Sequence, residues 1–206
     1  MGWNFGKQGH LGDRIASEPG VNKFSLLVRF AKLEGPRRNL VTRRTMNLSQ
    51  SEEPGPLEIR MVSAADFDEL ADIRIVAMQE SLERVGRFDP DRARERLRAS
   101  FDPNHTHWIV LGGQRVGFFA TRLAGREIWL DHLYIRPAFQ SRGIGSAILA
   151  TIFEMADELE RPLMVGALKE SRSNEFYLSH GFRFSHSSEW DNYYRREVKA
   201  SRGLAG

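Results

Sequence analysis

Apolar residues change their spacing in the middle of the chain, and this change predicts a strand followed by a helix. Residues 128–135 are mostly β-branched, aromatic or aliphatic, which is typical of a buried strand. Beyond Gly145 the apolar residues recur every three or four positions, a spacing that places them on one face of a helix. These residues are Ile148, Ile152, Met155 and Leu159. Residues 136–145 therefore form the turn between the two elements.

The same two spacings predict the other elements. Alternating or continuous apolar runs indicate strands at residues 57–62, 108–111, 116–120, 163–168, 182–185 and 193–198. A capping box, Ser63-x-x-Asp66, begins a helix that runs to about Val85, and helices are also expected at 91–100 and 171–180. We therefore expect a mixed α/β chain of six to seven strands and about four helices, with a strand–helix–strand crossover at its centre.

The turn at residues 140–145 has the properties of a phosphate-binding loop. The first amides of a helix have no partner inside it and carry the positive end of the helix dipole, so they can converge on an anion. Gly143 and Gly145 have no Cβ to hold a ligand away, and Arg142 adds positive charge. An ordinary strand-to-helix turn could contain the same glycines, but the position between a buried strand and an amphipathic helix favours phosphate binding.

Three segments of the chain resemble the GNAT superfamily of acyl-CoA-dependent N-acyltransferases. Gln140-Ser141-Arg142-Gly143-Ile144-Gly145 is similar to the family's Q/R-x-x-G-x-G/A pyrophosphate loop, and the segments Leu133–Pro137 and Asn174–Phe182 are similar to its flanking motifs. The resemblance covers roughly residues 57–198. It implies an α+β type of α/β fold, with a mixed and mostly antiparallel sheet that splays between its fourth and fifth strands at a β-bulge near His132 or Leu133.

The resemblance also implies acetyl-CoA as co-substrate and assigns its contacts. The opened strand would offer backbone groups to the pantetheine amides, the loop and first helical turn would hold the pyrophosphate, and an asparagine would contact the cofactor. The residues so assigned are Leu133, Tyr134, Ile135, Gln140, Ser141, Arg142, Gly143, Ile144, Gly145, Ser146 and Asn174. For Asn174, a helix-terminal residue that bonds its own backbone is the alternative.

Tyr177 is the candidate general acid for acetyl transfer to a primary amine by direct attack in a ternary complex. A phenol with a pKa of about 10 can protonate a departing thiolate whose own pKa is about 8.5, and the family's tyrosine has this spacing before Gly-Phe. The alternative is a packing tyrosine. Phe176 and Tyr177 point about 100° apart on a helix, so we do not expect both to face one core stripe.

The general base is left open among three residues. His132 has an ordinary pKa near neutrality, and Asp131 could act through a water molecule if burial raised its pKa. Glu80 lies in the helix that shapes the acceptor site in the family. Each of them has a purely structural role as its alternative.

Composition narrows the class of protein. Of 206 residues, 41% are apolar and 28% are charged, as in soluble globular proteins, and no run of eighteen apolar residues predicts a membrane span. Cysteine is absent, which excludes disulfides and thiolate metal sites and is compatible with a cytoplasmic location. His105 and His107 have no evident third ligand, so we expect no metal.

Charge divides the chain into a basic extension and a near-neutral domain. Residues 1–55 carry nine Lys or Arg against five acidic residues, whereas residues 56–206 carry 21 against 22. This balance argues against nucleic acid as the main partner of the domain. We expect residues 1–55 to be a disordered lead-in or an overlong start upstream of Met46, and residues 56–206 to be the acyltransferase domain.

Three functions are compatible with these features. The leading hypothesis is an N-acetyltransferase that acts on a small-molecule or peptide amine. A non-catalytic acyl-CoA-binding module is the alternative, and a dinucleotide-binding domain would need glycine where Ile148 stands. Four residues near the C-terminus could line the acceptor mouth, form a homodimer contact or simply pack a closing hairpin: Trp190, Asp191, Tyr193 and Tyr194.

Overall fold

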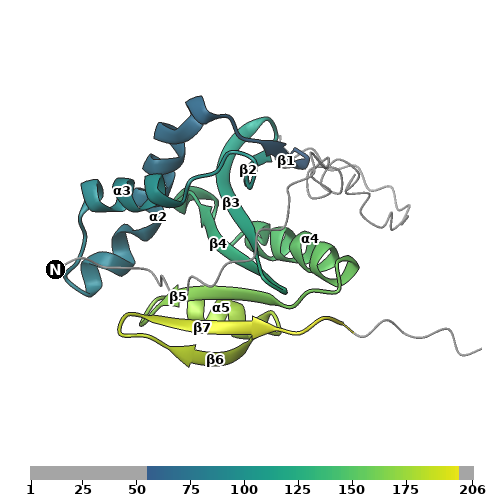
Figure 1. The fold of residues 1–206 in the computed structure, drawn as a ribbon. Helices are drawn as coiled ribbons and strands as arrows, with labels where there is room; N and C mark the ends of the chain where they lie inside the picture. Colours follow the sequence, from purple (N-terminus) through teal and green to yellow (C-terminus); the bar gives the residue numbers. More distant parts are fainter. Residues whose placement is uncertain (1–54, 200–206) are drawn as a thin grey trace, which may run out of the picture.

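A computed structural model describes residues 55–199 of the protein, so the expectations for the extension concern residues outside the described range. One seven-stranded sheet runs through the described region in the order β1-β2-β3-β4-β5-β7-β6 (Figure 1). Its strands are β1 (Leu57–Met61), β2 (Thr106–Leu111), β3 (Gln114–Ala124), β4 (Glu127–Ile135), β5 (Leu163–Leu168), β6 (Arg183–Ser187) and β7 (Asp191–Arg196). The helices are η1 (Ala64–Asp66), α2 (Phe67–Arg84), α3 (Pro90–Ser100), η2 (Pro137–Phe139), α4 (Ile144–Glu158) and α5 (Ser173–Ser179).

The expected mixed and mostly antiparallel sheet is confirmed. All neighbouring strands run antiparallel except β4 and β5, which are parallel and are connected through α4. A parallel pair needs such a crossover, because a short turn can only reverse the chain direction.

Local sequence explains where the helices on one face of the sheet begin. The backbone N–H of Ser63 donates to Asp66 Oδ2 at 2.8 Å, which is half of the expected capping box. Asp89 caps α3 by accepting a hydrogen bond of 3.0 Å from the N–H of Arg92, and Pro90 follows at the first helical position. These caps fix the two helices at the sequence positions from which their apolar faces reach the sheet.

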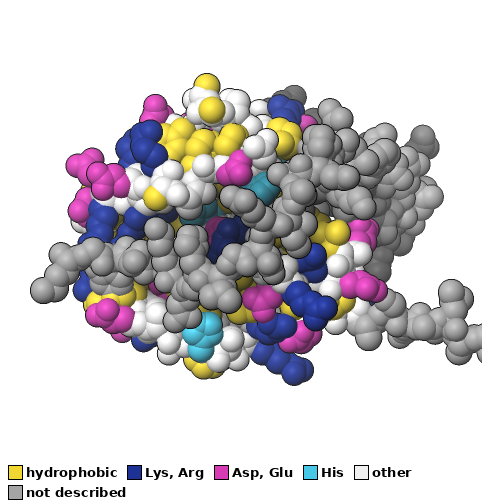
Figure 2. Space-filling model, in the orientation of Figure 1, with side chains coloured by type: hydrophobic (Ala, Val, Ile, Leu, Met, Phe, Trp, Pro, Cys, Tyr) yellow, Lys and Arg dark blue, Asp and Glu magenta, His cyan; other side chains and the backbone are white. Residues whose placement is uncertain are grey.

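The sheet separates two hydrophobic cores (Figure 1). On one face α2 and α3 bury Leu70, Ile73 and Leu97 against aromatic side chains of β2 and β3. On the other face α4 buries Ile148 and Ile152 against β4 and β5. Each fully buried aliphatic side chain contributes about 1.5–3 kcal/mol, so both cores hold their helices firmly on the sheet. On the outer surface of α2 and α3, basic and acidic side chains lie side by side (Figure 2).

A β-bulge opens the sheet between β4 and β5. Ala120 pairs with His132 and Thr121 pairs with Leu130, so Asp131 is the extra residue on β4, one position before the expected site. The parallel pairing of β4 with β5 covers only residues 128–130 and 163–165. Beyond this point the strands diverge, which confirms the expected splay between the fourth and fifth strands. One edge of residues 131–135 has no partner among the described strands.

Candidate active site

The turn before α4 has the backbone geometry of an anion-binding loop. Ser141 and Gly143 both adopt left-handed conformations, with φ of 59° and 78°. Such a conformation costs a non-glycine residue about 1–2 kcal/mol, so its presence at Ser141 marks a loop whose shape is imposed by its surroundings. Alternating left- and right-handed residues turn successive N–H groups toward one point. The side chain of Gln140 fixes the loop to β4 by donating to the Ile135 carbonyl at 2.8 Å.

The first turn of α4 leaves backbone donors available. The first hydrogen bond at this end runs from the N–H of Ala147 to the Gly143 carbonyl at 3.0 Å, so the N–H groups of residues 144–146 have no acceptor within the helix. Arg142 is exposed beside them, with its guanidinium carbon 5.2 Å from the centre of the Phe139 ring. These groups together can hold a phosphate or pyrophosphate.

The loop packs directly against α5. A Cβ atom on Gly145 would lie 3.1 Å from Cζ of Phe176, so glycine here allows the two helices to approach closely. His180 adds a polar link, because its Nδ1 donates to the Phe176 carbonyl at 2.7 Å and its Nε2 accepts from the Ser146 hydroxyl at 2.8 Å in the neutral ring. Sequence reasoning gave His180 no role, although it lies within the distal motif.

Asn174 uses its side chain to anchor α5. Its Nδ2 donates to the carbonyl groups of Leu168 and Ser171 at 2.8 and 2.7 Å, and its Oδ1 accepts from Asn192 and Tyr194 at 3.0 and 2.8 Å. These four bonds use the whole capacity of the amide. The structure thus gives Asn174 a positioning role, and its contact with a cofactor stays a prediction.

The part of β4 beyond its pairing with β5 presents one backbone edge to the opening and side chains to both cores. Leu133 and Ile135 pack toward the α4 core, and Tyr134 packs on Phe118 on the opposite face, with ring centres 5.4 Å apart. The edge that β5 no longer covers has N–H and C=O groups available to an extended ligand.

Tyr177 is only 6% exposed and joins the α4 core, with its ring 5.4 Å from that of Phe182. Burial raises the pKa of its phenol well above the ordinary value, and the neighbouring phenol of Tyr134 adds to this rise. The phenols of Tyr177 on α5 and Tyr134 on β4 therefore interact electrostatically. The expectation that Phe176 and Tyr177 would not both face the core is wrong, because Tyr177 belongs to the α4 core and Phe176 packs against the same core.

The two candidate bases on β4 lie in different surroundings. Desolvation and the charge of Arg74 lower the pKa of His132 to about 3, while Ser100 Oγ lies 3.2 Å from its Nε2. Burial raises the pKa of Asp131 despite an ion pair of 2.8 Å with Arg122. Asp131 borders a cavity of about 230 Å³ whose other lining residues are Ser100, Asp102, His105, Thr106, Ala120, Thr121 and Arg122.

Glu80, the third candidate, is exposed on α2 and forms ion pairs of 2.8 and 3.4 Å with Arg84 and Arg172. Arg84 also donates to the Glu170 carbonyl at 3.0 Å. The end of α2 therefore reaches across the opening to the segment between β5 and α5.

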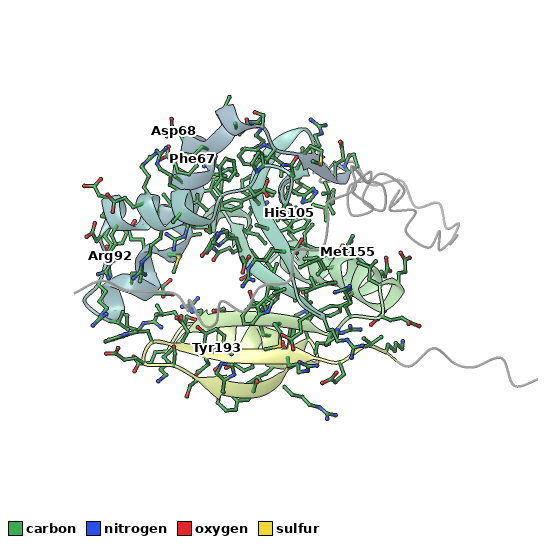
Figure 3. The ribbon with its side chains drawn as sticks, in the orientation of Figure 1. Phe67, Asp68, Arg92, His105, Met155 and Tyr193 are labelled. Carbon is green, nitrogen blue, oxygen red and sulfur yellow. The ribbon has the colours of Figure 1, made fainter. Side chains whose placement is uncertain are left out.

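A basic and an aromatic side chain link the α2–α3 connection to the β6–β7 turn. The guanidinium of Arg87 lies over the ring of Trp190, 3.2 Å from its centre, and so joins the α2–α3 connection to the β6–β7 turn. Figure 3 labels one residue on each of two neighbouring elements, Arg92 on α3 and Tyr193 on β7. Trp190 thus contacts the α2–α3 connection, and its place at the acceptor mouth stays a prediction.

Sequence reasoning missed Arg74 of α2. Its side chain is 7% exposed, and its Nη1 donates to the Ala93 carbonyl at 2.6 Å. The signal was present in the helical spacing, because Arg74 lies four residues after Leu70 and so occupies a position of the buried stripe.

Neither a membrane span nor a metal site is evident in residues 55–199. No helix in this range is long and apolar enough to cross a bilayer, and no group of three or more potential ligand side chains there is arranged to hold a metal ion.

Comparisons with known proteins agree with this geometry. Residues 103–184 match the family described as the acetyltransferase (GNAT) domain. No curated protein matches the sequence. Many solved structures share the fold.

Three of these structures illustrate the likeness. The PaiA N-acetyltransferase of Thermoplasma acidophilum in complex with coenzyme A is 15% identical, with a TM-score of 0.53 over 69% of this chain and 99% of that one. An acetyltransferase of Thermus thermophilus is 20% identical, with a TM-score of 0.57 over 69% and 97%. The ribosomal-protein-S18-alanine N-acetyltransferase of Escherichia coli is 14% identical, with a TM-score of 0.55 over 73% and 100%. At these identities the likeness shows the fold.

Proposed function

We propose that this chain, which carries an acetyltransferase (GNAT) domain, transfers the acetyl group of acetyl-CoA to a primary amine by direct attack in a ternary complex. The observation that carries this proposal is the opening between β4 and β5, with an anion-binding loop at one end and Tyr177 beside it. The acceptor is a small-molecule or peptide amine.

The residues on both sides of the opening fit acetyl-CoA. Backbone N–H groups from Ser141 to Ser146, together with Arg142, would hold the pyrophosphate. The uncovered edge of residues 133–135 would bond the pantetheine amides in the manner of an added strand. These contacts direct the thioester, which supplies the activated acetyl group, toward the space between Tyr134 and Tyr177.

A C–N bond forms and the C–S bond breaks, while the amine loses a proton to the base and the sulfur gains one from the acid. The amine nitrogen attacks the thioester carbonyl carbon, whose oxygen is held by a backbone N–H of β4. The C–S bond then breaks, and the sulfur receives a proton from Tyr177. The raised pKa keeps this phenol protonated at neutral pH, so that it has a proton to give to the departing sulfur.

Asp131 is the better candidate for the base that removes the amine proton. The pKa of His132, near 3, leaves its imidazole a weak base, whereas burial raises the pKa of Asp131. Ser100 lines the cavity beside Asp131 and also contacts His132, so the cavity adjoins the site. We propose that Asp131 acts there through a water molecule and that His132 helps to orient the acceptor.

Two measurements test this function. Thermal unfolding with coenzyme A, acetyl-CoA and NAD should show a higher melting temperature with the first two ligands only. A thiol-release assay with acetyl-CoA and a panel of amines should then show amine-dependent turnover. No shift with saturating coenzyme A would contradict acyl-CoA binding, and binding without release from any amine would support a non-catalytic module instead.

A further inference from the structure

Arg74 gives this site a preference for one chemical class of amine acceptor. We infer that the amine acceptor carries a carboxylate, which binds the guanidinium of Arg74 in a cationic site that includes Arg92 and Arg96. This inference rests on the proposed acetyl transfer and specifies its substrate class. It excludes polyamines as preferred acceptors, because their additional positive charges would be repelled.

Within residues 55–199, the guanidinium of Arg74 is buried without a counter-charge. The side chain is 7% exposed, and within residues 55–199 its Nε is buried with no hydrogen-bond partner. Its Nη1 bonds a carbonyl oxygen, that of Ala93, and no carboxylate of the described residues lies within ion-pair distance. An uncompensated buried charge is strongly destabilising, so its presence indicates an anionic partner in the working state.

Arg74 lies beside the proposed reaction centre. Its guanidinium carbon is 5.8 Å from the centre of the Tyr134 ring. Its charge also reaches His132, which stacks on Tyr134 with ring centres 5.7 Å apart. Tyr134 in turn interacts electrostatically with Tyr177. An acid group on Arg74 would therefore place an amine on the same molecule near the thioester when the two groups are separated by a short chain.

A second element brings further positive charge to the same space. Arg92, Arg96 and Ser100 recur every four residues on α3 and so share one face of that helix. Ser100 contacts His132, which shows that this face is directed at β4. Arg96 is half-buried and feels the charges of Arg74, Arg92 and Arg87.

Among the described residues, one acid acts on Arg96. Asp191 at the start of β7 is the acidic group that acts on Arg96, and Lys169 also acts on Asp191. In the part of the chain that the structure describes, the charged groups that these interactions connect are Arg74 of α2, Arg92 and Arg96 of α3, Arg87 between the two helices, Lys169 after β5 and Asp191 of β7, a balance that attracts an anion. A planar guanidinium fork binds a carboxylate through two parallel hydrogen bonds, which makes a carboxylate the fitting partner for the uncommitted nitrogens of Arg74.

The test compares acceptors that differ only in the acid group. Each of the twenty amino acids is assayed with acetyl-CoA for thiol release, and the best is compared with its carboxamide, with phosphoethanolamine and with spermidine. We expect kcat/KM for the carboxylate to exceed that for the carboxamide by about 10²-fold, as for one buried charge-assisted pair. A greater kcat/KM for phosphoethanolamine would replace the carboxylate by a phosphate, and equal or greater values for the carboxamide or spermidine would overturn the inference.

Two variants link this preference to Arg74. Arg74→Met replaces the buried charge by an apolar chain of similar length, so the protein should fold, bind coenzyme A as before and lose the preference. Arg94→Met on the same surface of the molecule removes an arginine that pairs with Asp68 and Asp72 at 2.7 and 2.6 Å, and it should retain the preference. Full preference in Arg74→Met would overturn the inference.

Binding separates this inference from the proposed function. If no amine releases thiol, calorimetry of the same amino acids with the coenzyme A complex still decides the matter. Binding that Arg74→Met abolishes would support the anion site while contradicting catalysis. A protein that binds none of them, or that turns over only neutral or cationic amines, would overturn the anion site alone.

Discussion

The hydroxyl of Tyr194 on β7 donates a hydrogen bond of 2.8 Å to Oδ1 of Asn174 on α5. Because the same amide also donates to the carbonyl of Leu168 at the end of β5, it joins three elements on one side of the sheet opening. Tyr177 lies one helical turn further along α5. Asn174 therefore determines where the proposed general acid lies relative to β4.

Removing this amide should destabilise the protein more than removing one of its bonds. Tyr194→Phe deletes one hydrogen bond and should lower the free energy of unfolding by about 1 kcal/mol. Asn174→Ala also leaves buried partners without hydrogen bonds, so we expect a loss of about 3 kcal/mol. Urea unfolding of the two variants measures both values. Equal effects would contradict an anchoring role, and a loss of coenzyme A affinity in Asn174→Ala at unchanged stability would indicate direct contact with the cofactor.

A larger side chain at Gly145 should separate the anion-binding loop from α5. Even a Cβ atom would lie 3.1 Å from the Phe176 ring, so Gly145→Val should cost about 1–3 kcal/mol of stability and weaken coenzyme A binding about tenfold. The double variant Gly145→Val with Phe176→Leu provides space for the new methyl groups and should recover part of both losses. Calorimetric titration with coenzyme A measures the affinity. Additive losses in the double variant would show that the Phe176 contact is not the cause.

The parts of the site that could be predicted from sequence are those made by one continuous segment. Residues 128–158 contain a strand, a turn and a helix whose apolar spacing identifies each element, and the backbone of that turn is the proposed phosphate site. The boundaries of β5 were predicted correctly for the same reason, because its apolar run is short and ends in polar residues. In contrast, β3 continues four residues beyond the expected end at Ala120. The side chains of Thr121 and Arg122 are polar, but both residues pair with β4.

Side-chain contacts between distant segments could not be predicted in this way. The partners of Asn174 lie up to 20 residues away in sequence, and Arg74 meets Tyr134 only because α2 packs on that face of the sheet. Apolar spacing shows that a helix has a buried face, but it does not show which residues of other elements cover that face. The sequence alone therefore did not predict the cationic site around Arg74, which forms only when α2 and α3 pack on the sheet.

Acid should destabilise the protein through His107. Both ring nitrogens of this buried residue have no partner within the described residues, and burial, followed by the charge of His105, lowers its pKa to about 4. Since the pKa in the unfolded chain is about 6.5, the unfolded state binds more protons as the pH falls from 6.5 toward 4, and stability is lost over that window. Between pH 7 and pH 5 the loss from this residue should be about 2 kcal/mol.

Replacing the imidazole isolates this effect. His107→Phe keeps a ring stacked on Phe119 but cannot take up a proton, so urea unfolding at the two pH values should show a smaller difference than in the wild type. The pKa of His132, lowered to about 3, acts with the same sign, so part of the pH dependence should remain. An unchanged difference in His107→Phe would show that its imidazole is not the source.

Tyr177→Phe examines the chemical step itself. The variant keeps the buried ring and its contact with Phe182 but removes the proton that the departing thiolate requires. The melting temperature and the Kd for coenzyme A should therefore stay close to those of the wild type, because the loop at residues 140–146 holds the pyrophosphate. A loss of both would indicate damaged packing rather than a missing acid.

The steady-state rate of thiol release by Tyr177→Phe, measured with the best accepted amine, is the most direct test of acetyl transfer at this site. We expect both kcat and kcat/KM to fall by about 10²-fold relative to the wild type, since a general acid acts only in the transition state. An unchanged rate in a folded variant that binds coenzyme A would contradict the account and remove Tyr177 from the mechanism.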